Sequence, residues 1–365
     1  MRMPVFRGAK RWTTIVTGVL LSSLLLAACG ENSPSILDTA GPVAASESGV
    51  FYAILIIATI IFVLVEGALI FAIFRYRDRP SVPTHRQIHG DLRIEAVWTV
   101  VPALVLFVVL GFTIRGLFEV ANQPAGKTVT VRAVGHQWWW EFYYPEYNIT
   151  TADSLVVPVG TIVHVDLYSN NVIHSFWVPN LTGKTDVIPG HDNQKWFKAD
   201  KTGTYEGLCA EFCGLQHANM KFNVVVDTPD KYQTWVTTQQ QVALSPAGGS
   251  LAAQGADVFK SAGCTACHGI VGVNLKSEDD PAVACDNPAK ACLVGPNLTH
   301  FGSRTLIAGG VLKNNADQCQ PGDLKNCNLA KWLADPQGIK PGNDMVVNVT
   351  PDQINKLVAY LESLK

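Results

Sequence analysis

A twelve-residue stretch, CAEFCGLQHANM, gathers side chains that bind soft metal ions. It contains Cys209, Cys213, His217 and Met220, although the chain has only four methionines in 365 residues. Thiolate and thioether sulfur select copper, and imidazole also suits this metal. If both thiolates bridged two copper ions, each ion would want one imidazole and one weak axial ligand. Met220 can serve one of the two ions axially.

The rest of such a copper shell must come from the backbone and from another part of the chain. The backbone carbonyl of Glu211, between the two cysteines, can serve the second ion axially. His174, in NNVIHSFWVPN, is the best candidate for the second imidazole. Two alternatives stay open. A Cys2His2 zinc site would leave Met220 unused, and Cys209 and Cys213 could instead form a disulfide.

A second motif, CTACH, places Cys264, Cys267 and His268 at the spacing of c-type haem attachment. The two thiols can reach the two vinyl groups of one haem, and the histidine then lies under the iron. A zinc site or a redox-active CxxC is the alternative. Met345, in the Gly/Pro/Asn-rich stretch GIKPGNDMVVN, can complete the iron shell, and Met/His ligation raises the potential. His300 is the other candidate for this sixth ligand.

The N-terminus predicts an export signal over residues 1–28. Basic residues precede an apolar stretch at positions 15–26, and LAAC follows. A cysteine directly after small residues resembles the lipobox of bacterial lipoproteins, in which Cys29 would be lipidated after cleavage. An ordinary signal peptide is the alternative. Residues 29–49 are then predicted to be an external tether.

Two apolar runs, Val50–Phe74 and Ala96–Phe118, are long enough to cross a membrane, since about 20 helical residues suffice at ~1.5 Å each. The segment between them carries five arginines against two aspartates, and positive loops stay in the cytoplasm. We therefore predict a transmembrane hairpin over residues 50–118 with its turn inside. Everything from about Glu119 onward would lie on the external, periplasmic face, as would a lipidated Cys29.

The exported part divides into two predicted domains. Residues 119–227 alternate apolar and polar side chains in short runs such as TVTVRAV, which favours an all-β sandwich or barrel. Residues 228–250 are polar, end in LSPAGGS and are predicted to be a helix-ended linker. Residues 251–365 carry helical patterns at both ends and predict an all-α domain. The net charge of −2 gives no indication of nucleic-acid binding.

Four further cysteines lie in the last of these domains. An exported domain favours disulfides, and four cysteines permit three pairings. Each near-neighbour pair closes a short loop within an apparent insertion, so we predict Cys285–Cys292 and Cys319–Cys327. Unpaired thiols are the alternative.

At this point the motifs resemble a known family. VIHSFWVPNLTGKTDVIPGHDN, GTYEGLCAEFCGLQHANMKFNVVV and GHQWWWEFYY are similar, almost residue by residue, to subunit II of cytochrome c oxidase. This resemblance covers about residues 48–227. The tail resembles a class I cytochrome c, with Met345 in the distal loop and Pro296, in GPNLTHFGSR, near the proximal histidine. Some bacterial oxidases carry such a cytochrome fused to subunit II.

The resemblance implies a fold of three parts: a two-helix transmembrane hairpin, a cupredoxin-like β domain and an all-α cytochrome c domain. It also implies that the dinuclear copper centre CuA is held by His174, Cys209, Glu211, Cys213, His217 and Met220. The Glu211 side chain resembles the one that reaches a magnesium ion shared with subunit I. Asn171 and His191 stand where many members have aspartate and arginine.

Two further residues match family positions. Trp138 matches the tryptophan at which family members receive electrons from cytochrome c, although a plain core aromatic is the alternative. Glu95 matches the glutamate at the mouth of a proton-uptake channel into subunit I. An ionisable group at a membrane edge supports such a role, and a solvated carboxylate at headgroup level is the alternative.

The function implied is that of subunit II of a haem-copper terminal oxidase in a bacterial plasma membrane. Electrons would pass from a donor, such as a cytochrome c or quinol-cytochrome c reductase, through the chain's own haem c to CuA. They would continue to subunit I, where oxygen is reduced to water with proton pumping; subunit III is a further expected partner. The alternatives are the CuA-bearing subunit of a nitric oxide reductase and a non-enzymatic copper-binding protein. A quinol oxidase subunit II would lack the copper ligands.

Overall fold

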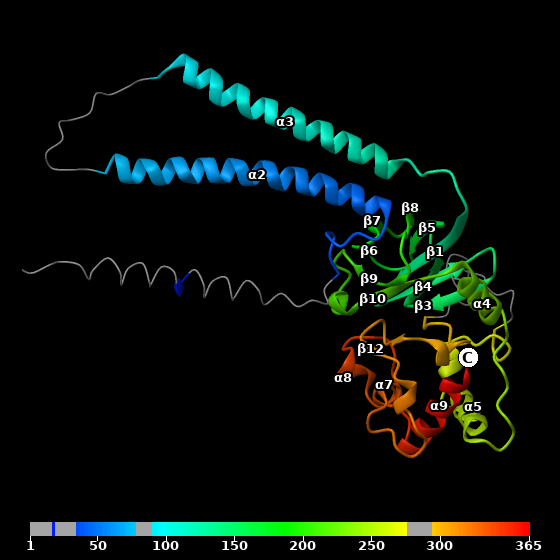
Figure 1. Cartoon of the computed structure of the whole chain (residues 1–365). Helices are drawn as coiled ribbons and strands as arrows, with labels where there is room; N and C mark the ends of the chain where they lie inside the picture. Colours follow the sequence, from blue (N-terminus) through cyan, green and yellow to red (C-terminus); the bar gives the residue numbers. More distant parts are fainter. Residues whose placement is uncertain (1–16, 19–33, 78–89, 276–293) are drawn as a thin grey trace, which may run out of the picture. The chain divides into compact units, whose positions relative to one another are not determined.

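The computed structural model describes residues 17–18, 34–77, 90–275 and 294–365 (Figure 1). Apart from positions 17 and 18, the predicted signal peptide lies outside the described residues, as do Cys29 and the predicted disulfide Cys285–Cys292.

Two long helices coincide with the two apolar runs. They are α2, Pro42–Arg75, and α3, Leu92–Ala121, and both are long and apolar enough to cross a membrane. With 34 residues, α2 is about 50 Å long at ~1.5 Å per residue, whereas a hydrocarbon core is ~30 Å thick. Both helices therefore extend past the predicted span, and α2 begins within the stretch predicted to be a tether.

The β domain is a sandwich of two five-stranded sheets, ordered β3-β2-β1-β5-β8 and β4-β10-β9-β6-β7. Burial alternates along its strands; in β10, for example, Phe222, Val224 and Val226 face the core. This is the period-2 pattern expected from the sequence. The strands are β1 Thr128–His136, β2 Trp139–Tyr144, β3 Ile149–Ala152, β4 Ser154–Pro158, β5 Ile162–Ser169, β6 His174–Val178, β7 Thr182–Val187, β8 Asn193–Lys198, β9 Gly203–Cys209 and β10 Lys221–Asp227.

The first turns of α2 pack against strands β7 and β8 of this sandwich. Val43 and Ala44 are each only 2% exposed. The Ser46 hydroxyl donates to a Glu119 carboxylate oxygen at 2.8 Å, which ties α2 to the end of α3. Gly116 permits close helix contact, since a Cβ there would lie 2.8 Å from a Val50 methyl. The α2 helix therefore joins the hairpin to the sandwich.

Aromatic side chains fill the sandwich core next to the predicted copper ligands. The rings of Phe176 on β6 and Phe222 on β10 stack with their centroids 5.0 Å apart, and Trp140 packs on both. All three side chains are fully buried. Each contributes roughly 1.5–3 kcal/mol by burial. This packing fixes β6 against β9 and β10, the strands that flank the copper loop.

Helices dominate the C-terminal part of the chain. The described helices beyond the sandwich are α4 Pro229–Gln239, α5 Leu251–Ser261, α7 Asn328–Ala334, α8 Pro336–Ile339 and α9 Pro351–Ser363. Short 3-10 turns lie at Cys264–Ala266, Phe301–Ser303 and Ala316–Gln318, and a two-stranded ribbon pairs β11, Leu306–Ile307, with β12, Leu312–Lys313.

Two of these helices, α5 and α9, form the core of the domain. The Phe259 and Tyr360 rings meet edge to face with centroids 5.7 Å apart. Helix α9 begins with a capping box between Thr350 and Gln353, which satisfies free backbone donors at its start. A disulfide with an S–S distance of 2.08 Å joins Cys319 to Cys327.

Candidate copper and haem sites

The copper-ligand candidates come from one loop and one neighbouring strand. Cys209 is the last residue of β9, the loop then runs through Cys213, and a 3-10 turn, His217–Asn219, leads to Met220 and β10. His174 is the first residue of β6, which pairs with β9. The sheet register therefore brings the distant histidine to the loop.

The two cysteine sulfurs lie 3.7 Å apart. A disulfide requires about 2.05 Å, so the disulfide alternative does not apply to this pair. Each sulfur has its own imidazole, with Cys209 Sγ at 3.8 Å from His174 Nδ1 and Cys213 Sγ at 3.8 Å from His217 Nδ1. The arrangement therefore has two equivalent halves.

Each half also holds one weak donor. The Met220 thioether sulfur lies 3.8 Å from Cys213 Sγ, and the Glu211 carbonyl oxygen lies 3.3 Å from Cys209 Sγ. A structural zinc ion uses four ligands, and the set here offers six. The two sulfurs, two imidazoles, thioether and carbonyl oxygen therefore suit a site for two copper ions. Within the described residues, His174, Cys209 and Cys213 also form the one group of three His, Cys, Asp or Glu side chains placed to share a metal.

The electrostatics of the loop favour a thiolate. The hydrogen bond between the two thiols lowers the pKa of Cys209, burial opposes this, and His174 adds a further lowering contact. The pKa of Cys213 is raised by the same shared proton. Metal binding requires deprotonated sulfur, so the pair is disposed to give up its first proton readily.

A second layer of contacts orients His174. Its Nε2 lies 3.1 Å from Asn171 Oδ1, which also accepts the Val172 amide at 2.7 Å. Nε2–H therefore donates to Asn171, and Nδ1 is left free for a metal. His174 is fully buried, and Gly135 makes room for it, because a Cβ there would lie 2.7 Å from the ring. Asn171 thus takes the orienting position although many family members have aspartate there.

Trp138 contacts the copper loop directly. Its indole Nε1 donates to the Cys213 carbonyl oxygen at 3.0 Å, and Gln137 Nε2 donates to the same oxygen at 2.7 Å. The sequence analysis missed Gln137, although it lies within the GHQWWWEFYY stretch. The Trp138 side chain is half-buried, whereas Trp140 is a core aromatic.

Two carboxylates lie apart from this cluster. The Glu211 side chain is exposed, while its carbonyl faces the sulfurs. Glu95 lies in the first turn of α3, which Asp91 caps by accepting the Arg93 amide at 2.9 Å. Both carboxylates are thus on surfaces where a partner could reach them.

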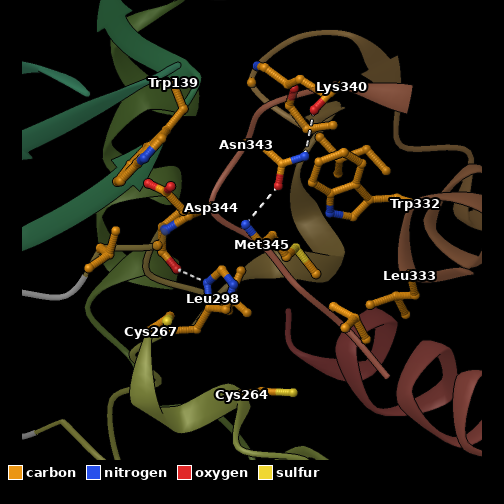
Figure 2. A pocket seen from close by; sticks show the side chains of 18 of the residues that line it. Trp139, Cys264, Cys267, Leu298, Trp332, Leu333, Lys340, Asn343, Asp344 and Met345 are labelled. Carbon is orange, nitrogen blue, oxygen red and sulfur yellow. Dashed lines mark hydrogen bonds between the residues drawn. The ribbon is translucent and has the colours of Figure 1, made fainter. Parts of the chain in front are cut away.

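The haem candidates surround one cavity of about 270 Å³. Cys264, Cys267, His268 and Met345 line it, and Trp332 supplies part of its apolar wall. Figure 2 shows the two cysteines and Met345 around this space. Both cysteines are free thiols, so the motif is not a disulfide here.

The orientation and tautomer of His268 suit an iron ligand. His268 Nδ1 lies 2.9 Å from the Pro296 carbonyl oxygen, so Nδ1–H donates and Nε2 remains free. Burial lowers the pKa of His268, which keeps the ring neutral. Gly295 leaves room for it, since a Cβ there would lie 2.6 Å from the ring. These donors, together with the two thiols, fit a covalently attached haem.

Met345, the predicted sixth ligand, lines the same cavity as His268. Its amide donates to Asn343 Oδ1 at 2.8 Å, and its carbonyl accepts from Gln337 Nε2 at 3.3 Å. The alternative ligand, His300, does not line this cavity; its Nε2 lies 3.0 Å from the Gln239 carbonyl.

Three regions of the chain match sequence families. Residues 148–228 match the family described as cytochrome c oxidase subunit II, periplasmic domain, residues 32–115 match its transmembrane domain, and residues 252–365 match cytochrome c. The cytochrome c oxidase subunit 2 of Alkalihalophilus pseudofirmus is 34% identical, over 98% of this chain and 99% of that protein. This chain belongs to the cytochrome c oxidase subunit II family.

Other relatives of this subunit II chain are more partial. The quinol oxidase subunit 2 of Bacillus subtilis is 31% identical over 66% of this chain and 75% of that protein. Among solved structures, the periplasmic domain of subunit II of the Bradyrhizobium japonicum cytochrome oxidase is 32% identical. It covers 32% of this chain and 97% of that one, with a TM-score of 0.31. Its family matches and its full-length relative make the chain a membrane-anchored subunit of a haem-copper oxidase, with a subunit II periplasmic domain and a cytochrome c domain.

The sequence analysis of this subunit II chain also missed a buried lysine. Lys340 is only 3% exposed and lies between the haem-ligand segment and the copper loop. Its type predicts a solvated surface position, and no motif distinguishes it.

Proposed function

We propose that this chain is the subunit through which electrons reach a haem-copper terminal oxidase. Electrons from an external donor would pass through its own haem c and then through the CuA pair to subunit I, where oxygen is reduced to water with proton pumping. The donor is a cytochrome c or a quinol-cytochrome c reductase, and subunit III completes the complex. The single observation that carries this proposal is the two-fold arrangement of six donors around Cys209 and Cys213.

That arrangement suits electron relay rather than metal storage. The redox chemistry itself is supplied by the copper pair and the haem when they are bound. The ligand loop runs between β9 and β10, His174 begins β6, and these strands pack around Phe176 and Phe222. A shell that is fixed beforehand moves little when charge changes, and this keeps the reorganisation barrier low.

Cys264 and Cys267 would hold the haem covalently, and His268 and Met345 would bind its iron. The Pro296 carbonyl supports this role because it fixes the His268 tautomer. Met/His ligation gives a high potential, which suits a donor that feeds a copper pair.

Trp138 is proposed to receive electrons for the copper centre. Two contacts of Trp138 support this role. Its indole donates to the Cys213 carbonyl, and its side chain lines the haem cavity. The chain's own cytochrome domain would then take the place that a soluble cytochrome c occupies in other family members.

The remaining roles rest on the family and on topology. Glu95 is proposed to guide protons into a channel of subunit I, and Glu211 to share a magnesium ion with that subunit. The domain boundaries, the lipoprotein-type signal peptide, lipidation of Cys29 and the periplasmic orientation in a bacterial plasma membrane belong to the same proposal. The arginine-rich connection between α2 and α3 supports this orientation.

The test is to purify the membrane complex and to measure metals, spectra and oxygen uptake together. We expect two coppers and one haem c per chain, a mixed-valence copper signal in EPR and oxygen consumption with a cytochrome-type donor. Zinc in place of copper would overturn the proposal. Donor oxidation coupled only to nitric oxide would assign the chain to a nitric oxide reductase. Copper without any donor oxidation would indicate a copper-binding protein.

A further inference from the structure

A buried lysine connects the haem-binding and copper-binding parts of the chain. The Lys340 ammonium nitrogen lies 2.6 Å from the Trp138 carbonyl oxygen, 3.2 Å from the Asn219 carbonyl oxygen and 2.9 Å from the Ala308 carbonyl oxygen. An ammonium has three protons to donate, and the site offers three acceptors. Two acceptors belong to the copper domain and the third to the cytochrome c domain.

The two copper-domain acceptors are next to functional residues. Trp138 also donates its indole N–H to the Cys213 carbonyl, and Asn219 directly precedes the copper-ligand candidate Met220. Lys340 itself is five residues before Met345, the candidate iron ligand. The ammonium is thus bonded to the backbone of the electron-accepting tryptophan and lies close in sequence to the haem's sixth ligand.

The segment around Lys340 is fitted to the copper loop along its length. Gln216 Nε2 donates to the Pro341 carbonyl at 2.8 Å. A Cβ at Gly342 would lie 2.9 Å from a Leu215 methyl. Asn343 bonds back to the Lys340 carbonyl at 2.6 Å and also holds the Met345 amide, as Figure 2 shows. A shift of this segment would therefore move the methionine with it.

A left-handed turn in the cytochrome c domain makes the lysine's approach possible. Ala308, Gly309 and Gly310 all have positive φ, at 57°, 66° and 84°. A Cβ at Gly309 would overlap both the Lys340 ammonium and the Trp138 carbonyl oxygen. The Gly309 carbonyl also accepts the Lys221 amide of β10 at 3.2 Å. A glycine is needed here, because any side chain would separate the two domains.

The charge at this site is nearly removed from water. Burial lowers the pKa of Lys340 to about 8, while nearby Asp153 opposes that change. A buried cation is costly unless its donors are satisfied. The three carbonyl oxygens satisfy them only when the domains meet in this register. The Lys340 site therefore favours one placement of the cytochrome c domain on the copper domain, whatever it adds to the affinity between them.

We propose that Lys340 is a positioning residue that holds the cytochrome c domain on the copper domain in the register used for internal electron transfer. It acts by fastening the Met345 segment to the backbone of Trp138, and Gly309 provides the space for this contact. The expected effect on electron transfer rests on the proposed function, because the rate of transfer between the two sites falls steeply with their separation. The contact itself can be tested separately.

The experiment compares Lys340→Met with the wild-type complex. Lys331→Met, an exposed lysine on α7 of the same domain, is the matched control. The first readout is hydrogen exchange in the segments 214–221 and 306–313, which needs no electron transfer. The second is the rate of electron equilibration between haem and copper after flash reduction of the haem. Optical and EPR spectra check that both sites are loaded.

We expect Lys340→Met to keep both spectra, to raise exchange in both segments and to slow internal transfer severalfold, since the rate of electron transfer falls steeply with the separation of the two sites. Lys331→Met should change neither readout. Gly309→Ala, which keeps the lysine but fills its space, should reproduce the effect and decides the matter if Lys340→Met does not assemble. Unchanged exchange and an unchanged rate in a loaded variant would overturn the proposal. A wild-type complex without a copper pair would instead refute the proposed function, while the exchange data would still report on the contact.

Discussion

The copper site and the haem site place their ligands on different kinds of scaffold. The copper donors lie within 3.8 Å of their neighbours, in one loop and at the start of β6, beside strands anchored by fully buried aromatic rings. The haem donors come from loops and short helices around a cavity of about 270 Å³. The first site is therefore supported by a core of protein side chains alone. The second needs its ligand as part of the core.

Preventing haem attachment is the most severe test of this difference between the two sites. Without haem, the largely apolar walls of this cavity of about 270 Å³ would be exposed to water, at roughly 25 cal/mol for each Å² of apolar surface. Domain stabilities are only roughly 5–15 kcal/mol in total. We expect Cys264→Ala combined with Cys267→Ala to unfold the cytochrome c domain while the sandwich stays folded. Limited proteolysis of the full chain, with mass spectrometry of the fragments, measures this.

The matched change in the other domain is Cys213→Ser. It removes a bridging sulfur, so copper content and the copper EPR signal should be lost, but the sandwich should remain protease-resistant. A cytochrome c domain that survives proteolysis without haem would contradict the contrast, as would a sandwich that unfolds without copper.

A second, smaller effect concerns the disulfide of the cytochrome c domain. Cys319 and Cys327 are eight residues apart, and closing so short a loop stabilises by about 2.5 kcal/mol in the chain-entropy description. Replacing both by serine should lower the free energy of unfolding of this domain by that amount. Guanidinium unfolding followed by haem absorbance measures it. The copper-domain transition is the internal control, and an equal loss there would rule out a local effect.

A third change tests whether Asn171 orients His174 in the copper shell. Asn171→Asp should place a negative charge at the Nε2–H of His174, increase the electron donation of its Nδ1 and favour the oxidised copper pair. At an exposed position the effect is on the order of 1 kcal/mol, or about 40 mV lower potential for a one-electron couple. Spectroelectrochemical titration measures it, with Asn193→Asp on β8 as control. An unchanged potential would show that Asn171 does not orient the imidazole.

The last effect is a pH dependence confined to the cytochrome c domain. Burial raises the pKa of Glu362 to about 7, against the opposing influence of Asn314 and Lys365. A raised pKa means that the folded state favours the proton, so the stability linked to Glu362 is full below about pH 4.5 and is lost as the pH rises through 7. Thermal unfolding of this domain at pH 5 and pH 8 should show a decline that Glu362→Gln removes. Asp323→Asn, at the surface of the same domain, should leave the decline in place.

Local patterns made much of the fold and both sets of ligands predictable. The copper loop keeps five of the six candidate donors within twelve residues, and CTACH carries three candidate haem contacts in five. Strand alternation and two long apolar runs indicated the sandwich and the hairpin. These signals are short-range, so no tertiary information was needed to read them.

Features that depend on tertiary placement could not be predicted from the sequence. The start of α2 at Pro42 falls in a stretch with no strong apolar period, and its packing on β7 and β8 keeps it helical. The burial of Lys340 depends on three distant carbonyls and on the open space at Gly309. Composition cannot reveal such a site, because a lysine in a Gly/Pro-rich loop normally lies in water.

The continuous passage of α2 from its apolar span into the face of the sandwich has a mechanical consequence. No loop interrupts the helix between these two parts, and the Ser46–Glu119 bond braces it against α3 near the top. A rotation of the helix pair is therefore transmitted to the sandwich as a rigid tilt instead of being absorbed by a hinge. Of the ~50 Å of α2, about 30 Å would lie in the hydrocarbon core, so the remaining ~20 Å of helix sets the distance between the sandwich and the bilayer.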